Sequence, residues 1–171
     1  LVVNNCGQAN LGIFKGGNYT FLHATFANYW NLNSTLPSFG IYATNEYNNG
    51  ISTEQGALTL NLQNSIIYTE RNNAIQFKPT SGQTFNYFIE NCLVKFDAAN
   101  AGFTWDGNTK IVNSIKNEDP KFENYFTQKM NLRVKATSPA KTKGKVSTAV
   151  LVPLDIVKVN RTSNPTIGAY Q

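Results

Sequence analysis

The stretch NYFIENCLVKF, residues 86–96, is one copy of a short strand pattern that recurs along the chain. Segments 64–67, 91–94 and 113–116 each begin with an Asn, continue with a small residue and then become apolar, in steps of 27 and 22 residues. Segments 1–6 and 21–28 look related, and the first ends in the same Asn-Cys pair as residues 91–92. This period without intervening helices predicts stacked coils, because one short strand cannot bury its apolar face alone.

The repeat predicts an all-β fold, a right-handed parallel β-helix. This solenoid has about five coils and an irregular C-terminal cap, in one domain over residues 1–171. Residues 1–117 form the coils, with a loop or an extra partial coil inserted at about 29–56, and residues 118–171 form the cap. The 24 Asn residues suit such a fold, since Asn tolerates left-handed turns and its side chains can stack in ladders. One continuous strand is expected from Tyr19 to Asn28.

The first residues predict an open edge. Leu1 begins directly inside a strand pattern, without a cap, an initiator Met or a preceding turn. We therefore expect the chain to be the C-terminal part of a longer protein or a trimmed product. The uncapped first coil would then offer an edge for end-to-end contact with another chain.

Aromatic residues in the inserted segment are the first candidate site. Sugar rings stack on exposed aromatic rings, and loops often carry binding residues. The candidate carbohydrate-binding residues are Tyr29, Trp30, Tyr42 and Tyr47. The alternative for Tyr29 and Trp30 is that they pack down and seal the side of the solenoid.

A column of acidic residues is the second candidate. Counting six residues past the repeated Asn gives Glu70, Asp97 and Asp119, with Lys95 beside them. Carboxylates about 5 Å apart on neighbouring coils would hold a cation or have raised pKa values. The alternative is that these acids are separate and solvated.

The charge balance is basic. The net charge is +5, and residues 129–161 contain eight basic residues against one acid, Asp155. Such a run could attract a polyanion such as an acidic polysaccharide, and the alternative is a solvated basic tail. Nucleic acid is not an expected partner, because no recognised binding module accompanies the charge. No hydrophobic run is long enough to span a membrane.

The single His and the two Cys residues predict structural roles. His23 lies in an apolar run without a carboxylate or nucleophile nearby in the sequence, which favours a structural histidine. Cys6 and Cys92 are expected to occupy equivalent Asn-Cys positions about three coils apart, roughly 14 Å, which is too far for a disulfide. Both are therefore predicted to be buried free thiols. No metal-ligand cluster is expected.

The C-terminal third resembles a known family. The matching fragments are NEDPKF (117–122), NLRVKATSPA (131–140), Gly144, Asp155, NR (160–161) and PTIGAYQ (165–171). They resemble the end of secreted bacterial right-handed parallel β-helix proteins of the pectate-lyase-like superfamily, and the Asn-Cys coils look like its repeats. Lys158 and Gln171 depart from a Gly and a Glu of that pattern, so the last turn is expected to be looser. The resemblance implies a non-catalytic cap that covers the last coil.

The resemblance also implies a function and a location. Our first hypothesis is a secreted or cell-surface module that is associated with polysaccharide, acidic polysaccharide included, and binds glycan or acts as a scaffold without catalysis. The second is a polysaccharide lyase or glycoside hydrolase acting on an acidic glycan. Lyases of the superfamily generally use calcium held by carboxylates and a basic residue that removes a proton, but no residue here matches such a motif. Calcium is expected only under this second hypothesis, and no other cofactor is expected. A third hypothesis is a structural piece that assembles through its first coil.

Overall fold

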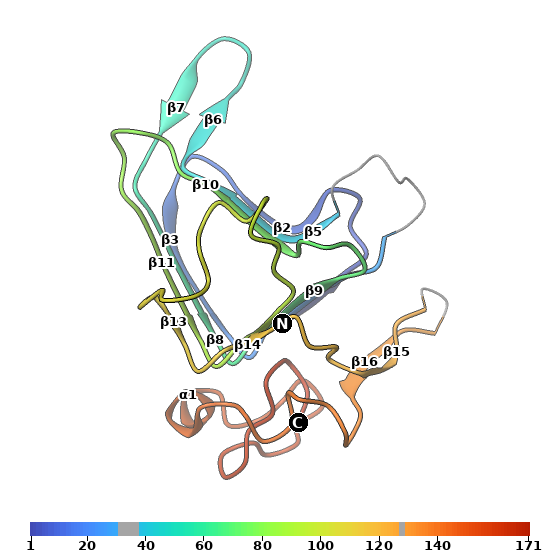
Figure 1. Cartoon of the computed structure of the whole chain (residues 1–171). Helices are drawn as coiled ribbons and strands as arrows, with labels where there is room; N and C mark the ends of the chain where they lie inside the picture. Colours follow the sequence, from blue (N-terminus) through green and yellow to red (C-terminus); the bar gives the residue numbers. More distant parts are fainter. Residues whose placement is uncertain (31–37, 127–128) are drawn as a thin grey trace.

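The computed structural model describes residues 1–30, 38–126 and 129–171 and consists mostly of β-strands in parallel sheets (Figure 1). The five-stranded sheet contains, in spatial order, β1 (Val2–Asn4), β4 (Thr25–Asn28), β9 (Ile66–Thr69), β12 (Leu93–Val94) and β14 (Ile115–Lys116). The three-stranded sheet contains β2 (Ala9–Ile13), β5 (Phe39–Thr44) and β10 (Ile75–Lys78). The four-stranded sheet contains β3 (Gly17–Leu22), β8 (Leu58–Gln63), β11 (Phe85–Glu90) and β13 (Ile111–Val112).

The remaining elements lie outside these three sheets. They are the antiparallel pairs β6 (Glu46–Asn48) with β7 (Thr53–Gln55) and β15 (Phe122–Asn124) with β16 (Asn131–Val134), and the helix α1 (Val146–Leu151). Hairpin β6–β7 and strand β5 both fall within the predicted insertion at 29–56. Strand β5 is the centre of the three-stranded sheet, whereas the hairpin projects from it (Figure 1). Residues 31–37 of that insertion lie outside the described residues.

The chain visits the three parallel sheets in rotation, so that sequential strands face one another across a shared interior (Figure 1). Neighbouring strands pair in register, as Thr25 with Ile66 and Ile66 with Leu93. Inward side chains from all three sheets form one apolar core, made among others of Phe26, Ile41, Leu60, Ile67, Ile75 and Ile89. The arrangement is compatible with a β-helix-like fold.

The repeated Asn marks a corner between the four-stranded and five-stranded sheets. His23, Asn64, Asn91 and Asn113 occupy this position with φ of 51°, 49°, 49° and 48°. The left-handed backbone there favours Asn, which tolerates positive φ better than most residues do. The expected single strand from Tyr19 to Asn28 is therefore wrong, because His23 turns the chain between β3 and β4.

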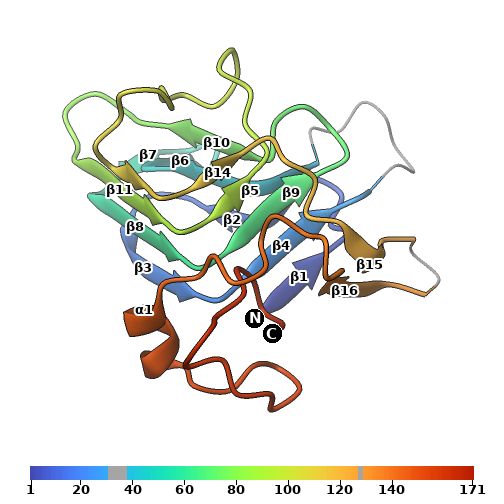
Figure 2. The same ribbon diagram turned by 60° about the horizontal axis from the view of Figure 1, so that its bottom comes forward.

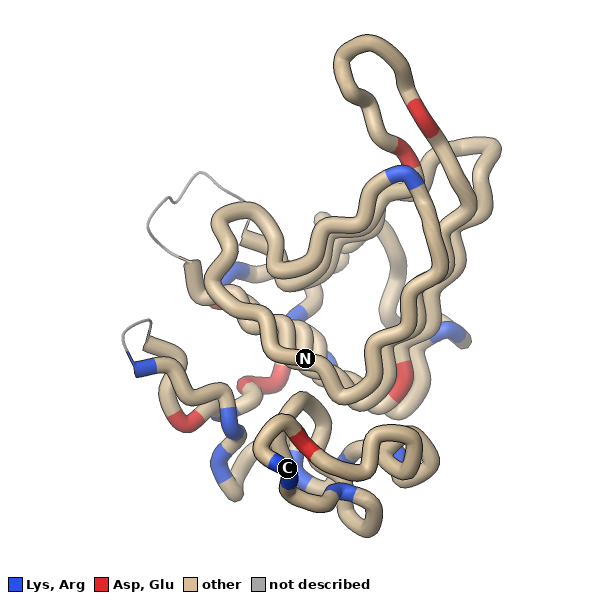
Figure 3. The backbone as a smooth tube through the Cα atoms, turned by 180° about the vertical axis from the view of Figure 1, so that it is seen from behind, with Lys and Arg blue, Asp and Glu red and all other residues tan. Residues whose placement is uncertain are grey.

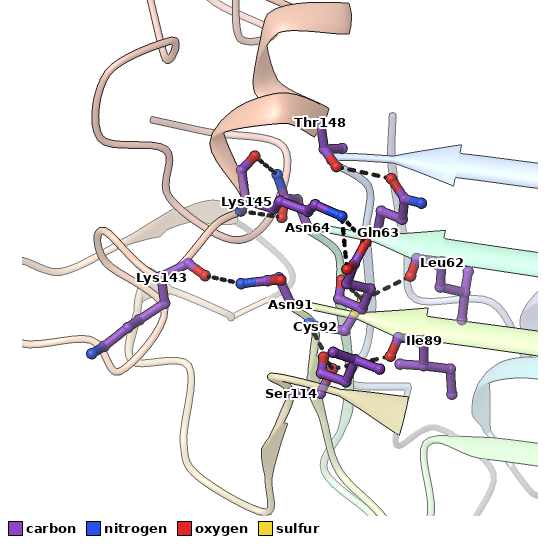
Figure 4. Close-up of polar contacts among 12 residues, drawn as sticks. Leu62, Gln63, Asn64, Ile89, Asn91, Cys92, Ser114, Lys143, Lys145 and Thr148 are labelled. Carbon is purple, nitrogen blue, oxygen red and sulfur yellow. Dashed lines mark hydrogen bonds and ion pairs between the residues drawn. The ribbon is translucent and has the colours of Figure 1, made fainter. Parts of the chain in front are cut away.

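The small residue after each corner links one coil to the next. The backbone N–H of Ala24 donates to Ser65 Oγ at 3.0 Å, and that of Ser65 to Cys92 Sγ at 3.4 Å. That of Cys92 donates to Ser114 Oγ at 3.0 Å (Figure 4). Each N–H freed by the turn thus finds an acceptor in the following coil. This explains why a small side chain with an oxygen or sulfur atom recurs at this position.

The two cysteines do not occupy equivalent positions. Val2 pairs with Thr25, so Leu1 takes the place in the first coil that Cys92 takes in the fourth, and Cys6 lies beyond the other end of β1. Both thiols are free, as expected, but only Cys92 is fully buried. The expectation of two buried thiols is therefore wrong for Cys6. Burial raises the pKa of the Cys92 thiol to about 12.

The C-terminal segment lies along the side of the coils. Outward-facing residues of the five-stranded sheet, Ala27, Ile66 and Leu93, form a second apolar cluster with residues of the tail, which are Phe122, Leu132, Val134, Ala140 and Ile167. Figure 2 shows the C-terminal segment beside β1, β4 and β9. The expected cap over the last coil is wrong in this respect. The five-stranded sheet is apolar on both faces, and its outer face has to be covered.

The corner column holds this tail in place. Asn64 Nδ2 donates to the carbonyl of Lys145 at 2.9 Å, and Asn64 Oδ1 accepts from the backbone N–H of Lys145 at 2.7 Å (Figure 4). In the next coil Asn91 Nδ2 donates to the carbonyl of Lys143 at 2.8 Å. Lys145 Nζ also forms an ion pair with Glu90 at 2.8 Å. The same Asn side chains therefore sit at the turn and bind the tail.

The three strands of the first coil are all edge strands of their sheets. Strands β1, β2 and β3 each have one strand partner among the described residues, and they lie at the same end of the stack. Their inward side chains Val3, Leu11, Tyr19 and Phe21 are only partly buried. End-to-end contact through this coil stays a prediction.

The corner column generates a stability prediction. Asn64→Ala should destabilise the fold by about 2 kcal/mol more than Asn113→Ala, because it also leaves the Lys145 N–H and C=O and the His23 ring without their side-chain partner. Asn113 is the matched control, with nearly the same φ but no hydrogen bond from its side chain within the described chain. Urea denaturation of both variants measures the difference, and equal losses would show that the tail contacts contribute nothing.

Candidate functional site

The outer side of the three-stranded sheet carries a group of aromatic side chains. Along β5 the residues alternate, with Ile41 and Ala43 buried in the core and Tyr42 facing outward. The aromatic face, as we name it, consists of Phe14, Phe39, Tyr42 and Tyr47. Phe14 directly follows β2, and Tyr47 comes from the projecting hairpin strand β6. Three separate segments of the chain therefore build this surface.

The rings are close enough to form one continuous surface. The ring centroids of Phe14 and Tyr42 are 5.7 Å apart, those of Phe14 and Tyr47 6.2 Å, and those of Phe39 and Tyr42 5.9 Å. Phe14 and Tyr47 keep 51% and 45% of their surface exposed. Gly12, the neighbour of Tyr42 in the sheet, provides the room, since a Cβ atom there would lie 2.9 Å from Cε2 of Phe14.

Two adjoining hollows flank Phe14 and Tyr42. The first has a volume of about 280 Å³ and is also lined by Gln8, Ala9, Gly12 and Phe39. The second has about 420 Å³ and is lined in addition by Thr44, Glu46, Tyr47, Asn48, Lys78, Pro79 and Thr80. Lys78 Nζ lies 5.9 Å from the centroid of the Tyr42 ring. The aromatic rings thus have amides, hydroxyls and a cation around them.

The hairpin that supplies Tyr47 is held at its base and tip. Lys15 forms an ion pair with Glu54 of β7, and Gln55 Nε2 donates to Glu46 Oε2 at 2.8 Å. At the tip, Asn49 Oδ1 accepts from the backbone N–H of Ile51 and of Ser52. These contacts fix the hairpin beside the sheet and so keep Tyr47 next to Phe14.

The structure separates the four predicted aromatic residues. Tyr42 and Tyr47 belong to the aromatic face. Tyr29 directly follows β4 and is buried, stacked on Tyr125 with 4.6 Å between ring centroids, and Trp30 is half-buried outside the face. Tyr29 therefore seals the side of the coils, which was the alternative for this residue. Burial raises its pKa, and the nearby Tyr68 and Asp119 raise it further.

The predicted acidic residues lie in two different hollows. Glu70, Asp119 and Lys95 line one of about 180 Å³ together with Tyr29, Tyr68 and Tyr125. Asp97 lines another with Asp106 and Lys116, and Lys95 lines both hollows. The Asp97 carboxylate accepts from the Ala99 N–H and from Asn100 Nδ2, so it stabilises its own turn instead of facing Glu70. Within the described ranges, no group of three His, Cys, Asp or Glu side chains could hold a metal ion.

The continuous row of aromatic rings, and not volume, favours the aromatic face as the binding site, because the hollow of Asp97 is as large, at about 440 Å³. Small-molecule sites usually occupy roughly 300–1,000 Å³, and the two hollows beside Phe14 come close to or within this range. The tyrosine-lined hollow is smaller. Sequence reasoning missed Phe14, Phe39 and Lys78 as members of the site. Register could have found Phe14 and Lys78, because Phe14 directly follows β2 and Lys78 ends β10, the two strands that flank β5.

Comparisons with known proteins do not assign a family. No family model, no curated protein and no solved structure matches the chain. The resemblance to the pectate-lyase-like superfamily therefore stays a prediction. In the part of the chain that the structure describes, no helix is long and apolar enough to cross a membrane.

His23 lies under the tail and is hydrogen-bonded on both ring nitrogens. Nδ1 is 3.2 Å from the carbonyl oxygen of Gly168, and Nε2 is 2.9 Å from Asn64 Nδ2. The carbonyl can only accept and the amide can only donate, so the neutral ring with its proton on Nδ1 satisfies both contacts. Burial and the charge of Arg161 lower the pKa of His23 to about 4. His23 therefore has a structural role at the tail.

This geometry predicts acid sensitivity. Between pH 6.5 and about 4 the unfolded chain binds a proton at His23 that the folded protein does not bind. Stability should therefore be complete above pH 6.5 and fall by up to about 3 kcal/mol as the pH drops to about 4.

His23→Asn is the matched variant, because Asn occupies the same corner in the following coils. It should flatten the pH dependence of the urea midpoint in this window. An unchanged slope in the variant would contradict the assignment.

Proposed function

We propose that the chain is a right-handed parallel β-helix of the pectate-lyase-like type that binds polysaccharide without catalysis, as a secreted or cell-surface module. The rotation of the chain through three parallel sheets and their shared core support the β-helix. The tail fragments that resemble the superfamily support its type and its location.

The aromatic face is the observation that carries the binding function. The carbon-bound hydrogens of a sugar ring pack on an aromatic ring, while the hydroxyls around the sugar need polar partners at the rim. Phe14, Tyr42 and Tyr47 offer the rings, and Gln8, Thr44 and Asn48 line the same hollows with polar groups. The two adjoining hollows have room for more than one sugar unit.

An acidic polysaccharide fits the charges best. Lys78 lies at the aromatic face and attracts an acidic group of the glycan over distances of about a Debye length, ~8–10 Å. Glu46 is the acid that lines the larger hollow. Binding should accordingly weaken as salt increases.

The experiment is a glycan array that includes neutral and acidic polysaccharides, with and without calcium. Phe14→Ala and Tyr47→Ala should each weaken binding about fivefold, because each removes a stacking ring worth roughly 1 kcal/mol. Phe126→Ala is the matched control, since Phe126 is an exposed ring outside the aromatic face. Equal losses in all three variants would contradict the proposed site.

Two further results separate the hypotheses. Gly12→Ala should displace the Phe14 ring and weaken binding without a large loss of stability, because the backbone of Gly12 is not left-handed. Formation of unsaturated ends on a polyuronate would instead support a lyase. Absence of binding across the array would favour a scaffold.

A further inference from the structure

The chain exposes an unusual amount of aliphatic surface in one short segment. The described residues include 13 exposed large apolar side chains, and seven of them lie between Val146 and Val159. We name these seven the 146–159 patch, and they are Val146, Val150, Leu151, Leu154, Ile156, Val157 and Val159. Exposed apolar side chains gathered in this way usually mark a surface that contacts another protein, a ligand or a membrane.

The first half of the patch lies on α1. Thr148 and Ala149 face the coils and are buried, and Thr148 Oγ1 donates to Gln63 Oε1 at 2.8 Å (Figure 4). Val146 and Val150, one turn apart, share a solvent-facing side with Leu151, which keeps 71% of its surface exposed. The polar contact thus fixes the helix with its aliphatic side outward.

The second half lies on a tight turn that follows the helix. Leu154 and Asn160 form an antiparallel bridge, and the Arg161 N–H donates to the carbonyl of Pro153 at 3.0 Å. The buried Asp155 carboxylate accepts from the backbone N–H of Val157 and of Val159, both at 2.8 Å. These contacts fix the turn so that its aliphatic side chains point into solvent. Ile156, for example, keeps 52% of its surface exposed.

The charges around the patch are positive. Lys141, Lys143 and Lys158 have no acidic partner among the described residues. Figure 3 shows several Lys and Arg positions along the C-terminal segment. Asp155 is the one acid between residues 129 and 161, and its carboxylate points inward to backbone N–H groups. Burial opposes its ionisation, but these donors together with the Gln171 N–H outweigh burial and lower its pKa. The surface therefore combines an aliphatic centre with a cationic border.

We propose that the 146–159 patch docks onto an anionic lipid surface. A bilayer with negative headgroups offers an apolar layer for the aliphatic side chains and a negative layer for the lysines. Protein–protein hot spots are instead enriched in Tyr, Trp and Arg, and the patch has no aromatic residue. A second copy would bring the same cationic border against itself, and like charges repel.

The patch and the aromatic face are independent surfaces. Figure 1 places α1 and the following turn on the side of the molecule opposite the β6–β7 hairpin, which carries Tyr47. Lipid docking would therefore leave the aromatic face accessible to glycan. The protein would lie on the lipid surface through the helix and the turn.

Vesicle co-sedimentation tests the proposal. The protein should bind vesicles of phosphatidylcholine mixed with phosphatidylglycerol, more weakly at high salt, and bind pure phosphatidylcholine vesicles poorly. The double variant Leu151→Ser and Ile156→Ser should lose affinity at least about tenfold, because two exposed aliphatic chains no longer enter the lipid. Lys143→Gln with Lys158→Gln should reduce binding to the level seen with pure phosphatidylcholine.

The matched control is Ile51→Ser, because Ile51 is an aliphatic residue with 96% exposure on the hairpin tip, outside the patch. It should bind the mixed vesicles like the unmodified protein, and thermal melts should show all variants folded. No binding to the mixed vesicles, or an equal loss in Ile51→Ser, would overturn the proposal. A concentration-dependent dimer that the Leu151→Ser and Ile156→Ser variant loses would overturn it in favour of a second copy.

Discussion

A left-handed turn that exposes backbone N–H groups at one corner is the constraint on which this structure depends. His23, Asn64 and Asn91 turn the chain from the four-stranded to the five-stranded sheet. The next residue's N–H then has no strand partner and bonds to a small side chain of the following coil, such as Ser65 or Ser114. An unsatisfied buried N–H would cost about 1–3 kcal/mol. The Asn-small pattern is therefore the chemical requirement of the corner.

The corner also decides which surfaces remain free. The side chains of Asn64 and Asn91 bind the backbone of the tail, so the tail lies beside the corner and covers the outer face of the five-stranded sheet. The three-stranded sheet lies on another side of the core (Figures 1 and 2). Its outer face keeps Phe14 and Tyr42 available. The position of the proposed glycan site follows from where the tail is bound.

Periodicity in the sequence predicted the parallel strands, because the Asn-small-apolar pattern is local and repeats. Periodicity failed for Cys6. The Asn5-Cys6 pair has the same residues as Asn91-Cys92, but it follows β1 whereas Asn91-Cys92 precedes β12. The lateral tail could not be predicted either. Ile66 and Leu93 face outward although the strands read as ordinary core segments, and only their contacts with Phe122 and Ile167 show this.

The candidate site was predicted in part for a similar reason. Tyr42 and Tyr47 stand out as aromatic residues in a polar segment, but Phe14 precedes Tyr42 by nearly a full coil. It joins them because β2 and β5 are neighbours in register, with Gly12 opposite Tyr42. Such a surface depends on strand register and on one missing side chain, and neither can be read from local composition.

The tail has a consequence for how the molecule unfolds. A stack in which each coil touches only its neighbours is nearly one-dimensional, and its ends can fray independently. Here the tail bonds to Thr25 in the second coil, Asn64 in the third and Asn91 in the fourth. Releasing it disrupts several coils at once, so the tail acts as a brace that couples them. A short stack thereby gains the cooperativity of a single globular unit.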